Sequence, residues 1–139
     1  MERTFVMIKP DAVRRNLIGK IITRFEEAQI PILAIKMMTL SKRLAEKHYA
    51  EHKGKKFYDN LIRFVTSGPV VSMVLEGENI ISKIREMVGA TDPAKAASGT
   101  IRGDLKENPV KSVTENMIHA SDSLESAQRE LELFFKELK

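Results

Sequence analysis

Hydrophobic residues along this chain follow two spacings, one typical of β-strands and the other of amphipathic helices. Apolar, β-prone runs predict strands at Thr4–Ile8, Ile32–Leu40 and Val70–Leu75, and a fourth, shorter strand ends at Met117 and Ile118. Apolar residues at helical spacing predict helices over residues 16–29, 41–52, 57–65, 79–88 and 123–138. Strands and helices therefore alternate over most of the chain.

Residues with strong boundary preferences mark the ends of these elements. Pro10 cannot donate to a strand ladder, so it ends the first strand and leaves Lys9 at the tip. Ser41 is a favourable N-cap for the second helix, and Asp122 with Glu125 resembles a capping box for the last. The stripe predicted for the last helix is Leu124, Ala127, Leu131, Phe134, Phe135 and Leu138.

Residues 89–115 show no periodicity and contain several glycines and prolines. Loops longer than about 12–15 residues are uncommon in compact domains, and those that occur are often functional. This segment leads directly into the fourth strand, so we expect it to be a long binding loop.

The order of elements predicts an α+β fold in a single domain, residues 1–139. Without the doubled helix and the extra C-terminal helix, the order is close to βαββαβ, the ferredoxin-like sandwich with a four-stranded antiparallel sheet covered by helices. A doubly wound parallel sheet is the alternative. It would favour a glycine-rich turn after the first strand, where this chain has Lys9-Pro10-Asp11.

Composition narrows the class of protein. The chain has 139 residues, 42% of them hydrophobic, and no cysteine for a disulfide, a thiolate metal site or a catalytic thiol. Its charged N-terminus does not resemble a signal peptide, and no apolar run approaches the ~20 residues of a membrane span. We expect a soluble cytoplasmic protein that does not associate with membranes.

The net charge of +4 comes from basic residues dispersed among acidic ones. Nucleic-acid-binding proteins more often gather basic residues in blocks and place aromatic residues at stacking intervals. A small anionic substrate fits this charge better than a long polyanion.

His119, one of three histidines, lies between the fourth predicted strand and the last helix. A helix N-terminus favours anions, and an imidazole with a pKa near 6.5 is about three-quarters neutral at pH 7, ready to act as nucleophile or base. On position alone, a histidine at a strand end is more often structural. The three histidines have no carboxylates at ligand spacing, so a permanent zinc site is not expected.

Other residues have two interpretations each. Lys9 is either a solvated charge or a phosphate ligand, and Glu130 is either a surface acid or the group that orients the imidazole. Tyr49, Phe57 and Leu61 form either a hydrophobic hinge between helices or the edge of a cleft on which a flat base stacks.

Five motifs distinguish between these interpretations. They are Arg3-Thr-Phe-Val-Met-Ile-Lys-Pro-Asp11, His48-Tyr49, Ser67-Gly-Pro-Val-Val71, Gly99-Thr-Ile-Arg-Gly-Asp104 and Asn116-Met-Ile-His-Ala-Ser-Asp122. In this order they resemble the nucleoside diphosphate kinase family over almost the whole chain. The resemblance implies a ferredoxin-like core and a ping-pong transfer of the γ-phosphoryl group, mainly from ATP with Mg²⁺, to a nucleoside diphosphate through a phosphohistidine.

The resemblance also implies a role for particular residues. His119 would be the nucleophile, through Nδ1, and Glu130 would hold the other ring nitrogen, with Ser121 near both and Tyr49 near the catalytic rim. The implied phosphate ligands are Lys9, Arg85, Thr91 and Arg102. Asn116 and Lys9 are the implied sugar ligands, and Phe57, Leu61 and Val113 the implied base contacts. Mg²⁺ is expected on the nucleotide phosphates and not on fixed protein ligands. Stacking discriminates little between bases, so broad base specificity is expected.

The chain departs from the family pattern in two places. The segment between Arg102 and Asn116 is several residues longer than expected, with Lys106–Pro109 as the insertion, and this bears on the assignment of Val113. Ala120 replaces a frequent glycine, which is tolerable if its φ is negative. The chain also ends soon after its last helix, which favours a homotetramer over a hexamer.

Two other functions could use the same fold: a non-catalytic nucleotide sensor and a phosphohistidine relay that acts on proteins. A sensor would be expected to lack His119 or its cationic neighbours, and all are present. A relay would leave the base and sugar positions without a purpose, and a purely structural assembly would leave the site unexplained. We therefore predict an oligomeric enzyme that acts on nucleoside tri- and diphosphates.

Overall fold

The computed structural model describes residues 1–136 and contains a four-stranded antiparallel sheet in the order β2-β3-β1-β4. The strands are β1 (Glu2–Ile8), β2 (Ile32–Met38), β3 (Val70–Gly77) and β4 (Ile118–Ala120). β1 pairs with β3 on one side and with β4 on the other. The N-terminal strand is therefore the direct neighbour of the strand that contains His119.

Helices cover both faces of this sheet. They are α1 (Pro10–Arg14), α2 (Ile18–Glu27), α3 (Lys42–His48), α4 (Tyr58–Val65), α5 (Ile80–Val88), α6 (Ile101–Leu105) and α7 (Leu124–Phe135). Short 3₁₀ turns η1 (Ala50–His52) and η2 (Pro93–Lys95) lie in the connections. Helices α2 and α5 lie on the one face that the ferredoxin-like prediction covers, and α3, α4 and α7 lie on the other. The strand order and the helix positions confirm the predicted α+β fold.

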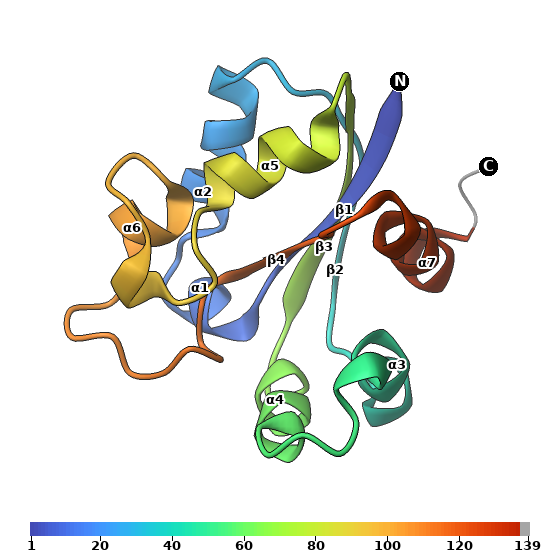
Figure 1. Cartoon of the computed structure of the whole chain (residues 1–139), viewed down its shortest axis with the longest axis vertical. Helices are drawn as coiled ribbons and strands as arrows, with labels where there is room; N and C mark the ends of the chain where they lie inside the picture. The colour runs from blue at the N-terminus through green and yellow to red at the C-terminus, as the bar shows by residue number, and fades with distance from the viewer. Residues whose placement is uncertain (137–139) are drawn as a thin grey trace.

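Alternating residues of β1 belong to two separate cores. Val6 and Ile8 pack with residues of α2 and α5, whereas Phe5 and Met7 pack with residues of α3, α4 and α7. Figure 1 shows α2 and α5 together on one side of the strands and α7 on the other. This alternation follows from the two-residue period of a strand, and it explains why β1 reads as continuously hydrophobic.

The short helix α1 was not predicted from the sequence. Lys9 is its N-cap residue, with extended backbone, and Pro10 occupies the first turn. A proline there has a φ suited to a helix, and its missing N–H is not needed for a helical hydrogen bond. Pro10 therefore ends β1 and also begins a helix, which turns the chain immediately after Lys9.

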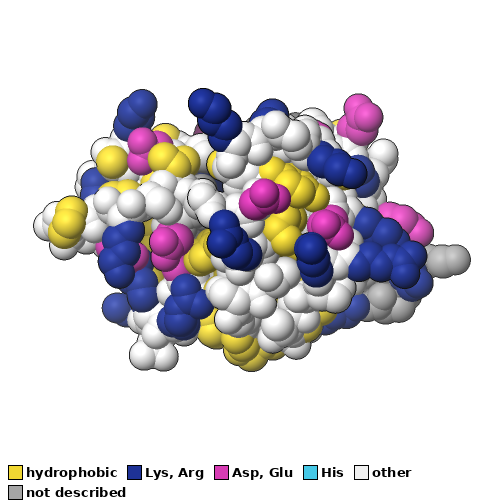
Figure 2. All heavy atoms as spheres, turned by 90° about the horizontal axis from the view of Figure 1, so that it is seen from below, with side chains coloured by type: hydrophobic (Ala, Val, Ile, Leu, Met, Phe, Trp, Pro, Cys, Tyr) yellow, Lys and Arg dark blue, Asp and Glu magenta, His cyan; other side chains and the backbone are white. Residues whose placement is uncertain are grey.

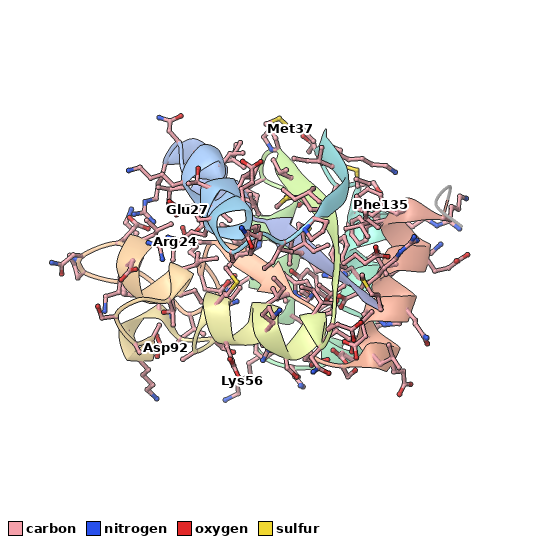
Figure 3. The ribbon with its side chains drawn as sticks, turned by 90° about the horizontal axis from the view of Figure 1, so that it is seen from above. Arg24, Glu27, Met37, Lys56, Asp92 and Phe135 are labelled. Atoms are coloured by element: carbon pink, nitrogen blue, oxygen red, sulfur yellow. The ribbon has the colours of Figure 1, made fainter. Side chains whose placement is uncertain are left out.

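The long segment before β4, predicted as a binding loop without periodicity, is partly helical. It contains η2 and α6, and the Thr100 side chain caps α6 by accepting a hydrogen bond from the Gly103 N–H. Asp104 accepts from the Gly99 N–H at 2.9 Å and forms an ion pair with Arg24 at 3.0 Å. Figure 3 labels Arg24 on α2, on the side that faces α6.

The start of the last helix also differs from the prediction. Ser123, and not Asp122, is the N-cap residue of α7, and its hydroxyl accepts from the Ser126 N–H at 3.0 Å. Leu124 was placed in the apolar stripe, but it is 54% exposed. Leu138 lies outside the described residues. The helix begins one residue later than the Asp122–Glu125 pattern indicated, and Leu124 is its first residue.

No helix among residues 1–136 combines the length and the apolar character needed to cross a bilayer.

Candidate active site

All the predicted site residues except Ser121 line one cavity of about 490 Å³. These lining residues are Lys9, Tyr49, Phe57, Leu61, Arg85, Thr91, Arg102, Val113, Asn116, His119 and Glu130. They come from α4, α5, α6, α7, the end of α3 and the segments around β1 and β4. The fold therefore brings together residues that the sequence separates by more than a hundred positions.

His119 is the middle residue of β4, whereas the sequence pattern had placed it just after the strand. It pairs with Met7, between the pairs Val6–Ala120 and Ile8–Ile118. Ile118 and Ala120 belong to the core on the α2 and α5 side, so His119 points to the opposite face of the sheet. Strand alternation thus aims the imidazole into the cavity.

An unusual backbone conformation at Met117 begins β4. Its φ is +74°, a value that residues other than glycine seldom adopt. The Met117 N–H donates to Asp11 Oδ2 at 3.1 Å, and its carbonyl accepts from the Lys9 N–H at 2.8 Å. Asp11 therefore fixes the turn that sets the register of His119, a role that was not assigned from the sequence although Asp11 lies in the first motif. Ala120 is not among the residues with positive φ, so alanine is accommodated there.

Glu130 holds one ring nitrogen of His119. Its Oε1 lies 2.9 Å from Nε2, and the same oxygen accepts a hydrogen bond from the Ser121 hydroxyl at 2.7 Å. Ser121 is fully buried and also accepts from the Phe5 N–H, which places it behind the carboxylate and out of the cavity. With Nε2 donating to a carboxylate, Nδ1 carries the free lone pair.

Burial and three cations keep His119 neutral. Desolvation, followed by the charges of Lys9, Arg102 and Arg85, lowers the pKa of His119 to about 3. The imidazole is therefore almost wholly neutral at pH 7, instead of the three-quarters expected from an ordinary pKa. Burial raises the pKa of Glu130 from its usual value, against the opposing influence of His48, Ser121 and Arg129.

Lys9 is buried at the floor of the cavity. Its Nζ donates to Asn116 Oδ1 at 2.9 Å, and Asn116 Nδ2 donates to the Thr91 carbonyl at 3.0 Å. Burial and the nearby Arg102 lower the pKa of Lys9 to about 7, although Asp11 opposes this. A lysine in this state gains its full charge when an anion arrives.

Arg102 donates hydrogen bonds to the backbone and also lines the cavity. Its guanidinium donates to the carbonyls of Asn116, Gly89 and Ile118, with Nε to Asn116 at 3.2 Å. These bonds use three of the five N–H groups of an arginine and leave two for a ligand. Arg85, on the last turn of α5, donates to the Ala120 carbonyl at 3.3 Å. Both arginines are thereby held at the same end of the cavity as His119.

The other end of the cavity is apolar and flat. Phe57 and Val113 are 43% and 49% exposed at its mouth, whereas Leu61 is buried beneath them. The segment with the predicted Lys106–Pro109 insertion brings Val113 to the cavity wall. Tyr49 lies between the two ends, and its buried hydroxyl has no hydrogen-bond partner among the described residues.

Two lining histidines had no role assigned from the sequence. His52 packs against Phe57, with ring centroids 5.4 Å apart. His48 lies 4.7 Å from His119 between ring centroids, and one ligand atom from each of His48, His119 and Glu130 lies within 4.8 Å of the others. This cluster could not be predicted from the sequence, because the residue spacing of a helix or a strand does not relate Glu130 to either histidine.

Charges of both signs are interspersed on the surface at the end of the molecule where α3 and α4 lie. Figure 2, seen from the end where α3 and α4 lie in Figure 1, shows lysine and arginine side chains spread over the surface with acidic side chains between them. The cations Lys9, Arg85 and Arg102 are instead gathered inside the cavity near His119. The arrangement suits a ligand with a flat apolar end and an anionic end.

Comparisons with known proteins agree with this geometry. A family model for nucleoside diphosphate kinase matches residues 2–139. A curated nucleoside diphosphate kinase from Methanocaldococcus jannaschii is 59% identical over 136 residues, which cover 98% of this chain and 94% of the relative.

Solved structures give the same result. The apo nucleoside diphosphate kinase of Encephalitozoon cuniculi superposes with a TM-score of 0.91 at 41% identity, covering 97% of this chain and 89% of that one. A halophilic nucleoside diphosphate kinase from Halobacterium salinarum, in complex with CDP, gives a TM-score of 0.90 at 47% identity over 96% and 87% of the two chains. This chain belongs to the nucleoside diphosphate kinase family of nucleotide phosphotransferases.

Proposed function

We propose that the chain moves a γ-phosphoryl group from a nucleoside triphosphate, mainly ATP, to a nucleoside diphosphate by way of a phosphohistidine at Nδ1 of His119. The observation that carries this proposal is the hydrogen bond between Nε2 of His119 and Glu130, at 2.9 Å. It fixes the tautomer that leaves a lone pair on Nδ1, on a ring that is neutral at physiological pH.

The reaction balances without an added acid or base. Nδ1 attacks the γ-phosphorus as the bond from that phosphorus to the β,γ-bridging oxygen breaks, and the nucleoside diphosphate leaves with the electron pair. Nε2 keeps its proton and its bond to Glu130 throughout. A second diphosphate then attacks the phosphohistidine through a terminal β-oxygen, and Nδ1 recovers its lone pair.

Lys9, Arg85 and Arg102 neutralise the charge that spreads over the phosphoryl oxygens during transfer. A unit-charge pair at 4 Å is worth about 4 kcal/mol at an effective dielectric constant of 20. Each cation would therefore lower the barrier to phosphoryl transfer substantially. Buried Lys9 donates to Asn116 in the free protein, and its charge is favoured by phosphate.

Four polar residues complete the predicted site. The orphan hydroxyl of Tyr49 is suited to donate to the transferring group, because a buried hydroxyl without a partner costs free energy until a ligand satisfies it. Asn116 would bind the sugar hydroxyls together with Lys9, to which it is hydrogen-bonded, and Thr91 would bind a phosphate oxygen, since all three line the cavity. Ser121 acts behind the site by fixing the Glu130 carboxylate.

The base would stack on Phe57, with Leu61 below it and Val113 opposite. A π-face is common to all bases, so this contact supports broad base specificity. The Halobacterium salinarum structure is a complex with CDP, which is consistent with a nucleotide in the corresponding cavity.

Mg²⁺ would arrive on the nucleotide phosphates and supply charge neutralisation there. Mg²⁺ prefers oxygen ligands in octahedral geometry. The one group of metal-type donors found among the described residues is His48, His119 and Glu130, which offers two nitrogens and a single carboxylate. That donor set does not suit Mg²⁺, so the prediction of no fixed protein ligand for it stands as part of this proposal.

Self-association is the last part of the proposal. β2 is an edge strand of the sheet, and Leu33, Ile35 and Met37 alternate along it with exposures of 40%, 53% and 58%. Met37, labelled in Figure 3, lies at an outer edge of the molecule. An apolar edge strand favours pairing with a second copy of the chain. A tetramer in place of a hexamer, and a cytoplasmic location, stay predictions from the sequence.

The proposed function is tested by incubating ATP, Mg²⁺ and GDP with the pure protein and measuring GTP by ion-exchange chromatography. We expect GTP with the native chain and none above background with His119→Asn, which keeps a polar side chain but cannot form the intermediate. Nucleotide binding without GTP formation by the native chain would instead indicate a sensor. Light scattering of Ile35→Lys beside the native chain tests self-association, and an unchanged mass would contradict the role of β2.

A further inference from the structure

The most enclosed imidazole of the cavity wall is His48, on the last turn of α3. It is 2% exposed, and neither ring nitrogen has a hydrogen-bond partner among the described residues. Buried polar atoms are nearly always paired, so a histidine with two unpaired nitrogens beside the nucleophile needs an explanation.

His48 is surrounded by aromatic rings that it meets at steep angles. The centroid of its ring lies 4.4 Å from Tyr49, 4.7 Å from His119, 5.2 Å from Phe134 and 5.8 Å from Phe5. The interplanar angles are 72°, 80°, 88° and 62° in the same order. Edge-to-face contacts of this kind fix the relative orientation of two rings.

We infer that His48 is a positioning residue for His119 and that it acts through its flat aromatic shape and not through its nitrogens. The inference rests on the proposed function, since it concerns the group that receives the phosphoryl. Besides its covalent bond to Cβ, the His119 ring is held by Glu130 at Nε2 alone, which leaves a limited pivot about the Cβ–Cγ bond. The ring of His48, nearly perpendicular to it at 4.7 Å, blocks the pivot.

Orientation matters because Nδ1 must point along the line of attack on phosphorus. A displacement of about 1 Å in a reacting group can cost on the order of 100-fold in rate. Substrate binding depends instead on Phe57, Lys9 and the arginines, none of which His48 is shown to hold. Loss of the His48 ring is therefore expected to slow phosphorylation while nucleotide affinity changes little.

The surroundings of His48 explain why its ring nitrogens take no part in positioning His119. Burial holds the pKa of His48 well below the usual value. The ring stays neutral and does not compete with His119 for the Glu130 carboxylate. A metal ion shared by His48, His119 and Glu130 would have to bind in a cavity that also holds the three cations Lys9, Arg85 and Arg102.

The test compares His48→Phe, His48→Ala and His48→Leu. The phenylalanine keeps a flat ring without nitrogens, and the leucine keeps apolar volume without a flat ring. Phe25→Leu serves as a matched control, because Phe25 is fully buried in the core on the other face of the sheet. For each folded variant, the rate of phosphoenzyme formation is measured in a single turnover by quench-flow and mass spectrometry, and the nucleotide Kd is measured separately.

We expect His48→Ala and His48→Leu to slow phosphorylation by about tenfold or more, with Kd within about threefold, and His48→Phe to restore the rate to within about threefold of the native chain. Phe25→Leu should lose stability without this loss of rate. A loss in His48→Phe equal to that in His48→Ala would overturn the inference and assign the role to the nitrogens. Native rates in all three His48 variants would overturn it as well.

Two further measurements keep the test independent of other failures. If His48→Ala does not fold, the pair His48→Leu and His48→Phe makes the same comparison at similar volume. If the native chain forms no phosphoenzyme, the proposed function fails, and nitrogen-15 NMR of His119 then tests the inference by itself. A single Nε2–H tautomer in native and His48→Phe proteins, with ring averaging in His48→Leu, would support positioning, and identical spectra in all three would overturn it.

Discussion

Oε1 of Glu130 lies 2.9 Å from Nε2 of His119, although one residue belongs to helix α7 and the other to strand β4. The carboxylate is almost fully buried and is also bonded to the Ser121 hydroxyl. A single helix position thus sets the tautomer of His119, and the bond does not depend on a substrate.

Glu130→Gln removes the charge of this contact and keeps its shape. Hydrogen bonds to charged groups are worth about 1.5–3 kcal/mol, so we expect phosphoenzyme formation to slow by on the order of 10- to 100-fold. Steady-state and single-turnover rates measure this loss. Glu132→Gln, a neighbouring and more exposed acid on α7, is the control and should keep the native rate. An unimpaired Glu130→Gln protein would show that the hydrogen bond does not hold the reactive tautomer.

The low pKa of Lys9 predicts a pH dependence in the free enzyme. Lys9 carries its charge below about pH 7 and loses it above, because burial and Arg102 lower the pKa to about 7. The value of kcat/KM reports the free enzyme, so it should fall above pH 7 by up to about tenfold per pH unit. Lys9→Arg, whose charge does not titrate in this range, should remove the slope even if it lowers the rate. A flat native profile from pH 6 to 9 would contradict the assignment of Lys9.

Phe57→Ala tests base stacking. Stacking on an aromatic ring is worth about 1–3 kcal/mol per base, so KM should rise by about 5- to 100-fold. The increase should be similar for ATP, GTP and CTP, since each base offers a π-face. Phe57→Trp is the matched variant and should restore a low KM. A loss confined to one base would mean that the cavity also recognises base edges.

His48 predicts acid sensitivity of the fold. Its folded pKa lies well below the usual 6.5, so the unfolded chain binds more protons between those two values and the free energy of unfolding falls as the pH drops below 6.5. The slope from this residue is at most about 1.4 kcal/mol per pH unit. His48→Phe removes it, whereas the contribution of His119 is common to both proteins. Urea unfolding at pH 7, 6 and 5 should therefore show a growing advantage of His48→Phe, and parallel curves would contradict a neutral buried His48.

Much of the architecture was predictable because local patterns agreed with the tertiary structure. The strand runs, the Ser41 cap and the amphipathic helices followed from periodicity, and the Ser41 hydroxyl does accept from the Leu44 N–H. The motifs named the residues that line the cavity. Their distances and pKa values required the fold, since His119 becomes almost wholly neutral through burial first and then through the charges of Lys9 and Arg102, which reach it from other elements.

The remaining features had no local signal. Helices α1 and α6 are each five residues long, too short to show a period. The role of Asp11 depends on the positive φ of Met117, and that of His48 depends on rings from β1, β4 and α7. Contacts of this kind form between segments far apart in the chain. The sequence therefore identifies the residues but does not predict their positions in space.

The most direct test of the mechanism is intact mass spectrometry of the native chain and of His119→Asn after mixing with ATP and Mg²⁺. Phosphohistidine transfer predicts one added phosphoryl group on the native chain, stable to base and labile to acid, absent in the variant and discharged by GDP. GTP formation by a native chain that never carries a phosphoryl group would contradict a covalent intermediate on His119.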